Sequence, residues 1–196
     1  MKMLIPFLLL SIGIYSDQAD WNKEYDKNGI KIYTRNVGNS SVKEYRGVVE
    51  VKATPSYCVA QIKDLKKYSK FMYKTTHSEM VKVVSDNEWI MYCIVDFPWP
   101  YNDRDLVMKY TVYPMGKEVY KVKFYSLDGM VPKKDGYERM HNLSGSWTFE
   151  PVVNGITRAT HESKASTDGF PSWLVNMFIL DAPKHIMPSF RTQVEG

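Results

Sequence analysis

The sequence predicts an α+β fold in which a curved antiparallel β-sheet wraps around a long C-terminal helix. Between residues 79 and 165, apolar and polar side chains alternate with a period of two over six successive segments. From residue 170 this alternation gives way to an apolar stretch typical of a buried helix. A sheet of that many twisted strands tends to curl, and a helix that is apolar on all sides would fill the inside of the curl.

The first 19 residues have the pattern of a signal peptide. Lys2 precedes an apolar run from Met3 to Tyr15, and small or polar residues follow. The run is shorter than the roughly 20 apolar residues that cross a bilayer, so we expect cleavage between Ser16 and Ala19 rather than anchoring. The sequence therefore predicts an exported protein, periplasmic or secreted, in which residues 20–196 form one domain.

The composition of the chain is that of a folded globular protein. Charged residues make up 24% and aromatic residues 14%, and there is no internal repeat or low-complexity segment. The net charge is +4, with lysines scattered along the chain rather than massed in one block, which argues against a nucleic-acid partner.

The chain after the signal segment begins with two predicted strands. A short amphipathic opening at residues 21–27 leads through Asn28-Gly29 into a β-like run at residues 30–35. A second β-like run follows at residues 42–51. We therefore expect these two strands to precede the first helix.

One helix is expected between the two strand regions. Thr54 supplies a cap and Pro55 a first helical position, and apolar residues then recur at helical spacing to about Tyr68. Cys58 lies in this helix and Cys93 in a later strand. Their apolar surroundings favour two buried free thiols, although a disulfide would form in an oxidising compartment if the Cα atoms lay within about 7 Å.

Six antiparallel strands are expected next, joined by short turns. Asn154-Gly155 is the strongest hairpin signal, and Asp86-Asn87 and Met115-Gly116 provide two further turns. The predicted strands are Glu79 to Ser85, Glu88 to Phe97, Asp105 to Tyr113, Glu118 to Ser126, Leu143 to Glu150 and Ile156 to Ala165.

The last predicted element is a helix from Phe170 to Phe190. Pro171 lies at its start, and Pro183 and Pro188 should kink it or split it into two pieces. Its apolar side chains need cover all round, and we expect the helix to contribute ligand contacts. The candidates are Trp173, Met177 and Phe178.

Strand alternation separates an outer face from an inner one. Lysines on three strands (Lys109, Lys121, Lys123 and Lys164) label the outer face, and Asp96 labels it on a fourth. The residues of opposite parity should face inward and line an apolar cavity. The candidate ligand contacts on these strands are Met91, Cys93, Met108, Tyr110, Tyr120, Val122, Phe124 and His161.

Arg104 is the one charged residue that the same alternation turns inward. An unpaired guanidinium is costly inside a protein, so Arg104 needs an acidic or a ligand partner. Two interpretations remain open, an internal ion pair that closes a turn and a polar anchor for a ligand headgroup. Arg104 is therefore the candidate polar ligand contact.

Three stretches resemble the START (steroidogenic acute regulatory-related lipid transfer) domain family, especially its phosphatidylcholine-transfer-like branch. FPWPYNDRDLV, from Phe97 to Val107, is similar to the family's aromatic-proline turn, Arg-Asp pair and strand. DGYERMHNLSGSWTFEP, from Asp135 to Pro151, is similar to its arginine, Gly-x-Trp strand and proline. STDGFPSWLVN, from Ser166 to Asn176, resembles the opening of its C-terminal helix. The likeness extends from about Trp21 to Phe190.

The resemblance implies a helix-grip fold with a lipid-sized tunnel between the sheet and the C-terminal helix. It also implies that Arg104 faces the tunnel, in agreement with the alternation. Many family members carry an acidic partner for this arginine in the preceding strand, whereas that strand here offers only Asp96, which should point outward. The sequence therefore leaves the acidic partner of Arg104 unidentified.

We expect a non-catalytic protein that binds one lipid or other hydrophobic small molecule without cofactor or metal, and transfer of that ligand stays open. The four histidines lack metal-ligand spacing, and neither a nucleophile elbow nor a phosphate-binding loop is present. Trp99 is suited either to a transient membrane contact or to a packed turn. Two alternatives stay open: a polyketide cyclase or aromatase that uses His161 as general base, and a ligand-sensing regulatory protein.

Overall fold

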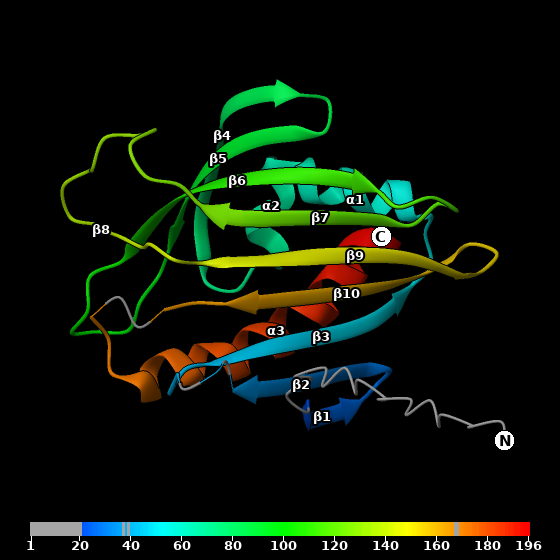
Figure 1. Cartoon of the computed structure of the whole chain (residues 1–196), viewed down its shortest axis with the longest axis horizontal. Helices are drawn as coiled ribbons and strands as arrows, with labels where there is room; N and C mark the ends of the chain where they lie inside the picture. Colours follow the sequence, from blue (N-terminus) through cyan, green and yellow to red (C-terminus); the bar gives the residue numbers. More distant parts are fainter. Residues whose placement is uncertain (1–20, 37, 39, 167–168) are drawn as a thin grey trace, which may run out of the picture.

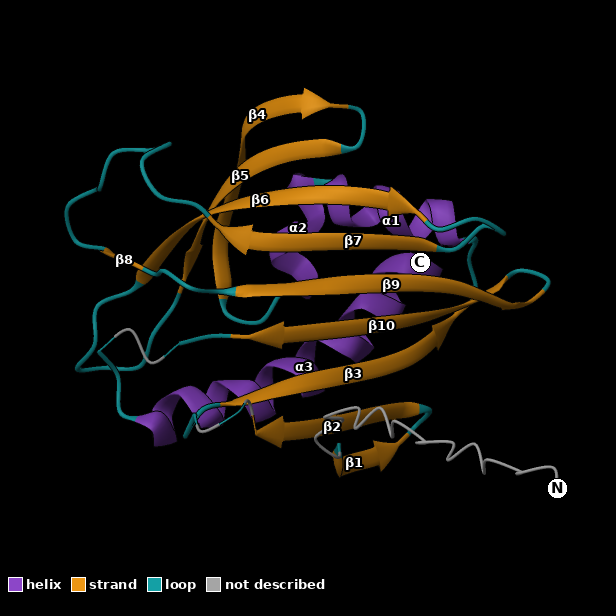
Figure 2. Cartoon of the chain, viewed as in Figure 1, coloured by secondary structure: helices purple, strands orange, loops and turns teal. Residues whose placement is uncertain are grey.

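The computed structural model describes residues 21–36, 38, 40–166 and 169–196. Within these ranges the chain forms one curved ten-stranded sheet and three helices (Figures 1 and 2). All three helices lie on the same face of the sheet, with α3 crossing it. The α+β fold with a curved antiparallel sheet around a C-terminal helix is therefore confirmed. The predicted signal peptide, residues 1–19, lies outside the described residues.

Three strands, not two, precede the first helix: β1 (Asn22–Lys27), β2 (Ile30–Asn36) and β3 (Lys43–Val51). Asn28 and Gly29 have φ angles of 53° and 70°, the left-handed conformation that a tight hairpin turn requires. The opening segment that the sequence placed outside the sheet is thus the edge strand β1. Its mostly exposed polar side chains give no alternating pattern, so only the turn indicated the hairpin.

The predicted single helix is two helices, α1 (Pro55–Lys63) and α2 (Leu65–Phe71). Thr54 caps α1 as predicted, its Oγ1 accepting a hydrogen bond from the backbone N–H of Tyr57 at 3.3 Å. Asp64 separates the helices with φ −77° and ψ 85°, which lies outside the helical region. The break lets each helix bury its own apolar side chains against the sheet and α3.

The six predicted long strands are present, and a two-residue strand, β8, joins them. The turn at Asn154-Gly155 connects β9 and β10 as predicted. All strand pairs are antiparallel except β6–β8, which is parallel. The strands are β4 (Thr75–Ser85), β5 (Glu88–Val95), β6 (Arg104–Pro114), β7 (Tyr120–Ser126), β8 (Glu138–Arg139), β9 (Ser144–Val153) and β10 (Ile156–Lys164).

The strand order is β1-β2-β3-β10-β9-β7-β6-β5-β4, with β8 beside β6. α1 and α2 carry the chain from β3 to the far edge at β4, and a meander then returns it to β3. This return pairs β10 with β3 and brings His161 opposite Gly47. The last strand, β10, therefore lies between β3 and β9 and joins the three N-terminal strands to the meander.

α3 (Ser172–Glu195) is one helix that continues through Pro183 and Pro188, so of the two predicted alternatives, a kink or a split, the split is wrong. Pro183 is buried in a helix that packs along β3, and this packing holds the chain helical across the missing backbone N–H. A Cβ at Gly47 would lie 2.7 Å from Cγ of Met187, so α3 rests on bare backbone of β3. Gly47 thus sets how closely the helix approaches the sheet.

Two apolar clusters divide α3. Its C-terminal half enters the main core of the sheet through Ile186, Met187 and Phe190. Its N-terminal half belongs to a second cluster with Phe97 and Phe170. Among the described residues no helix is long and apolar enough to cross a membrane.

Candidate functional site

A cavity of about 150 Å³ lies between the concave face of the sheet and the N-terminal half of α3. Side chains from β3, α2, β5, β6, β7, β10 and α3 line it, so it is built from segments distant in sequence. An engineered cavity of about this volume in another protein holds benzene. A lipid-sized ligand would therefore require the lining to open.

The sheet side of the cavity follows the strand alternation. Leu106, Met108 and Tyr110 of β6 line it, with Cys93 on β5 and Phe124 on β7. Lys109, of opposite parity on β6, pairs instead with Glu88, its Nζ 2.9 Å from the carboxylate. The inward assignment of this face is confirmed, and it is the step that the lysines made predictable.

The helix side of the cavity comes from one stripe of α3. Val175, Phe178, Ile179 and Ala182 recur at helical spacing and line the cavity. Phe178 stacks on Phe97, with ring centroids 4.6 Å apart. This aromatic contact joins α3 to the segment between β5 and β6, so the helix and that segment together close one end of the cavity.

His161 on β10 lines the cavity and is buried, with 1% of its surface exposed. Its ring stacks on Trp147 at a centroid distance of 4.2 Å, and its Nδ1 lies 2.9 Å from the hydroxyl of Tyr45. Nε2 has no hydrogen-bond partner among the described residues. Burial lowers the pKa of His161 to about 3, so the imidazole is neutral near pH 7.

A second polar pair on the cavity wall is formed by Tyr68 of α2 and Tyr110 of β6. Their hydroxyl oxygens are 2.6 Å apart, and both side chains are buried. Burial raises the pKa of both phenols, so both remain neutral. The pair fastens α2 to the sheet and adds polarity without charge.

Arg104 is buried at the start of β6, with its guanidinium bound to protein groups. Nη1 lies 2.6 Å from a carboxylate oxygen of Glu138 and donates to the carbonyl of Asn102 at 3.1 Å. The guanidinium also lies 4.2 Å from the ring centroid of Phe170. The acidic partner that the sequence left unidentified is therefore Glu138, from β8 rather than from the preceding strand.

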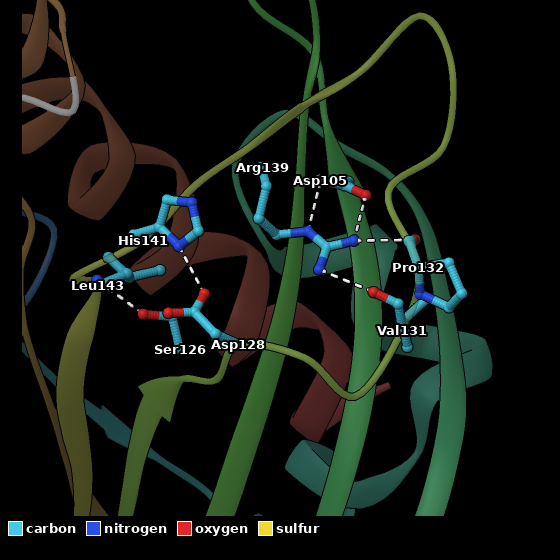
Figure 3. Close-up of polar contacts among 8 residues, drawn as sticks. All are labelled: Asp105, Ser126, Asp128, Val131, Pro132, Arg139, His141 and Leu143. Carbon is cyan, nitrogen blue, oxygen red and sulfur yellow. Dashed lines mark hydrogen bonds and ion pairs between the residues drawn. The ribbon is translucent and has the colours of Figure 1, made fainter.

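A second ion pair, between Arg139 of β8 and Asp105 of β6, lies on the opposite face of the sheet from the Arg104–Glu138 pair (Figure 3). Arg139 donates to both carboxylate oxygens of Asp105 at 2.7 and 2.9 Å, and to the carbonyls of Val131 and Pro132. Burial alone would raise the pKa of Asp105, but the hydrogen bonds and charge of Arg139 outweigh it and lower the pKa. The two-residue pairing of β6 with β8 therefore carries one ion pair on each face.

The predicted site residues fall into three groups. Cys93, Met108, Tyr110, Phe124, His161 and Phe178 line the cavity. Four others do not line the cavity. Met91 and Val122 are buried in the main core, Tyr120 packs against that core, and Arg104 is held by its own ion pair. Trp173 and Met177 are 65% and 38% exposed, so their placement as cavity contacts is wrong: the all-apolar stretch carried no signal for which face of α3 turns inward.

Sequence reasoning missed several lining residues on β3 and α2. Tyr45 has the same parity as Gly47, Val49 and Val51, and all but the glycine are buried apolar side chains, so alternation along that strand would have found it. Tyr68 lies at the predicted end of the first helix, where periodicity gives no inward direction.

The remaining polar groups suggest no metal centre. No group of three or more histidine, cysteine, aspartate or glutamate side chains that could hold a metal ion occurs within the described ranges. Cys58 and Cys93 are free and buried, as the sequence favoured. Burial raises the pKa of the Cys93 thiol to about 12, so this cavity group is also neutral.

Comparison with known proteins places these features in one family. The START domain family model matches residues 9–182. The structure resembles that of a STAR-related lipid transfer protein from Xanthomonas axonopodis, with 30% identity, a TM-score of 0.83, and coverage of 89% of this chain and 98% of that one.

Two curated proteins are similar in sequence. An uncharacterized protein of Pseudomonas aeruginosa is 29% identical over 90% of this chain and 87% of its own length. Phosphatidylcholine transfer protein of Rattus norvegicus is 26% identical over 88% of this chain and 80% of its own. The Zhui aromatase/cyclase from Streptomyces shares the fold more distantly, with 14% identity and a TM-score of 0.50. The chain belongs to the START domain family, whose fold implies binding of a lipid or other hydrophobic ligand.

Proposed function

We propose that this domain binds one lipid or other apolar molecule in the cavity between the sheet and α3, and that it does not catalyse a reaction of that ligand. The observation that carries the proposal is the apolar lining of this cavity. Its walls are aliphatic and aromatic side chains with a few neutral polar groups. Each CH₂ group buried there contributes about 0.8 kcal/mol, so an acyl chain gains affinity without specific polar contacts.

A cavity-filling variant tests this proposal. Ala182 lines the cavity on α3, whereas Lys184 on the same helix is exposed. Ala182→Phe should reduce uptake of a fluorescent fatty-acyl probe from vesicles at least ten-fold, and Lys184→Phe should leave uptake unchanged. Equal uptake by both variants, with both folded by circular dichroism, would contradict binding in this cavity.

Ligand exchange is proposed to occur at a membrane surface. Trp99 and Trp173 are 92% and 65% exposed. Trp99 and Trp173 come two and three residues after Phe97 and Phe170, whose rings line the cavity and stack with centroids 5.0 Å apart. We therefore place both tryptophans near that end of the cavity. Exposed tryptophans favour the bilayer interface, where the apolar ring and the indole N–H are both accommodated.

The exchange proposal separates rate from affinity. Trp99→Ala combined with Trp173→Ala should slow transfer between vesicles about ten-fold while leaving the amount bound at equilibrium unchanged. Met115→Ala is the control, because Met115 is 64% exposed in the turn between β6 and β7, at the opposite end of the sheet (Figure 1). Unchanged transfer by the double variant would contradict membrane docking through this end.

Non-catalytic binding is also favoured over the cyclase alternative by the state of His161. A general base works best when its pKa lies near the working pH. Burial holds the pKa of His161 at about 3, and Nδ1 is engaged by Tyr45, a neutral phenol rather than a carboxylate. Cyclisation of a linear polyketide that His161→Ala abolishes would overturn this part of the proposal.

Export is proposed from the N-terminal segment. The proposal predicts that the protein accumulates outside the cytoplasm and that its mature chain begins near residue 20. Cell fractionation followed by N-terminal sequencing checks both points. A cytoplasmic protein that retains Met1 would contradict export.

A further inference from the structure

His161 has one ring nitrogen engaged by the protein and one left without a partner. Tyr45 OH lies 2.9 Å from Nδ1, whereas Nε2 is buried and makes no hydrogen bond within the part of the chain that the structure describes. A buried polar atom without a partner is uncommon in folded proteins and costs free energy. Since the ring also lines the cavity, a ligand in the cavity is the natural source of the missing hydrogen bond.

The contact with Tyr45 fixes which kind of partner Nε2 needs. Tyr45 is buried, and the one hydrogen bond that its hydroxyl makes to the described residues is the contact with Nδ1 of His161. If the hydroxyl accepted from Nδ1–H, its own hydrogen would be buried without an acceptor. We therefore infer that Tyr45 donates to Nδ1 and that the hydrogen of the neutral ring resides on Nε2. Nε2 therefore requires an acceptor oxygen.

The charges around the cavity argue against an ionic group at that position. No lysine, arginine, aspartate or glutamate occurs among the described residues that line it. The nearby guanidinium of Arg104 is bound to Glu138 and Asn102 and stacks beside Phe170. A phosphate or carboxylate inside the cavity would lose its hydration without gaining a counter-charge, which is far more costly than burying a hydroxyl or carbonyl.

We propose that the cavity selects a ligand whose buried polar group is an uncharged acceptor oxygen, a hydroxyl or a carbonyl, which accepts a hydrogen bond from Nε2–H of His161. The proposal rests on the proposed function and deepens it by naming the ligand chemistry. Neutral lipids with one buried oxygen fit this chemistry. Lipids that must bury a phosphate headgroup do not.

The test uses four ligands with the same eight-carbon chain: octane, 1-octanol, 2-octanone and octyl phosphocholine. Each is titrated against a neutral apolar fluorophore, N-phenyl-1-naphthylamine, bound to wild type or to His161→Leu, and displacement of the fluorophore is measured. Because octane leaves water more readily than the other ligands, the informative quantity is the change that the substitution causes for each one. Loss of one hydrogen bond in His161→Leu should lower the affinity for 1-octanol and 2-octanone about three- to ten-fold relative to wild type, and the affinity for octane should change less than about two-fold. Octyl phosphocholine should displace the fluorophore from neither protein.

A spectroscopic measurement keeps the test decisive if His161→Leu does not fold. In a long-range ¹H–¹⁵N spectrum of wild type, the Nε2 resonance of His161 should show the protonated form. It should shift on addition of 2-octanone and stay in place on addition of octane.

Three outcomes overturn the inference while leaving the proposed function standing. They are an equal loss for octane and octanone, preferential binding of octyl phosphocholine, and an Nε2 resonance that 2-octanone does not shift. Failure of all four ligands and of the fluorophore to bind wild type would overturn the proposed function together with it.

Discussion

Arg104 and Glu138 face each other across the parallel bridge between β6 and β8, with Nη1 of the guanidinium 2.6 Å from the carboxylate. The side chain of Arg104 is 6% exposed, whereas that of Glu138 is 56% exposed. The charge of a buried cation is thus balanced by a carboxylate at the surface.

Removal of the carboxylate of Glu138 should therefore destabilise the fold. Glu138→Gln leaves the guanidinium of Arg104 buried without its counter-charge, and the free energy of unfolding should fall by about 1–2 kcal/mol. Urea unfolding measures the change. Asp135→Asn, an exposed substitution in the same loop, is the control and should stay within about 0.5 kcal/mol of wild type. Equal values for the two variants would show that the ion pair contributes nothing.

The Asp105–Arg139 ion pair, on the other face of the sheet, should contribute more to the free energy of unfolding than the Arg104–Glu138 pair. Both side chains of Asp105 and Arg139 are nearly fully buried, so Asp105→Asn leaves Arg139 charged and uncompensated. We expect a loss of about 3 kcal/mol. The exposed pair of Glu50 with Arg158 provides a matched control, because Glu50→Gln should cost less than about 1 kcal/mol. Equal losses in thermal unfolding would contradict the assigned burial.

Gly47 should be intolerant of a side chain because of α3. The Cβ of Gly47→Ala would meet Cγ and Sδ of Met187 at 2.7 and 2.8 Å, which predicts a loss of about 1–3 kcal/mol from overpacking. Met187→Ala in the same chain removes the atoms that clash. The double variant should therefore be more stable than the sum of the single changes predicts, and strict additivity would exclude the contact.

Burial of His161 makes stability depend on pH. The pKa of its imidazole falls from 6.5 to about 3 on folding. Between these values the unfolded chain binds more protons than the folded protein, so the free energy of unfolding falls as the pH drops below about 6.5. His161 contributes at most about 1.4 kcal/mol per pH unit. His161→Gln should flatten the unfolding free energy between pH 4 and 6, and an unchanged slope would show that the imidazole titrates normally.

The strand alternation could be predicted because lysines label one face. The outward lysines on β6 and β7 (Lys109, Lys121 and Lys123) assigned the residues of opposite parity to the inner face. Met108, Tyr110 and Phe124 have that parity, and the structure places all three at the cavity. When one face of a sheet is solvated, the alternation of polar and apolar residues along each strand is enough to assign the two faces.

Contacts made across long sequence distances could not be predicted in this way. Glu138 meets Arg104 through a two-residue parallel bridge, and periodicity does not encode the register of so short a pair. Trp173 and Met177 were misplaced because a stretch that is apolar on nearly every position specifies no inward stripe. Pro183 and Pro188 suggested a broken helix, but packing against β3 maintains it.

Native mass spectrometry of the purified protein tests the central claim most directly. Protein isolated without detergent from its own host should carry one uncharged lipid per chain, released by organic extraction and absent from the Ala182→Phe variant. A folded protein that is free of lipid and takes none up from vesicles would contradict the account.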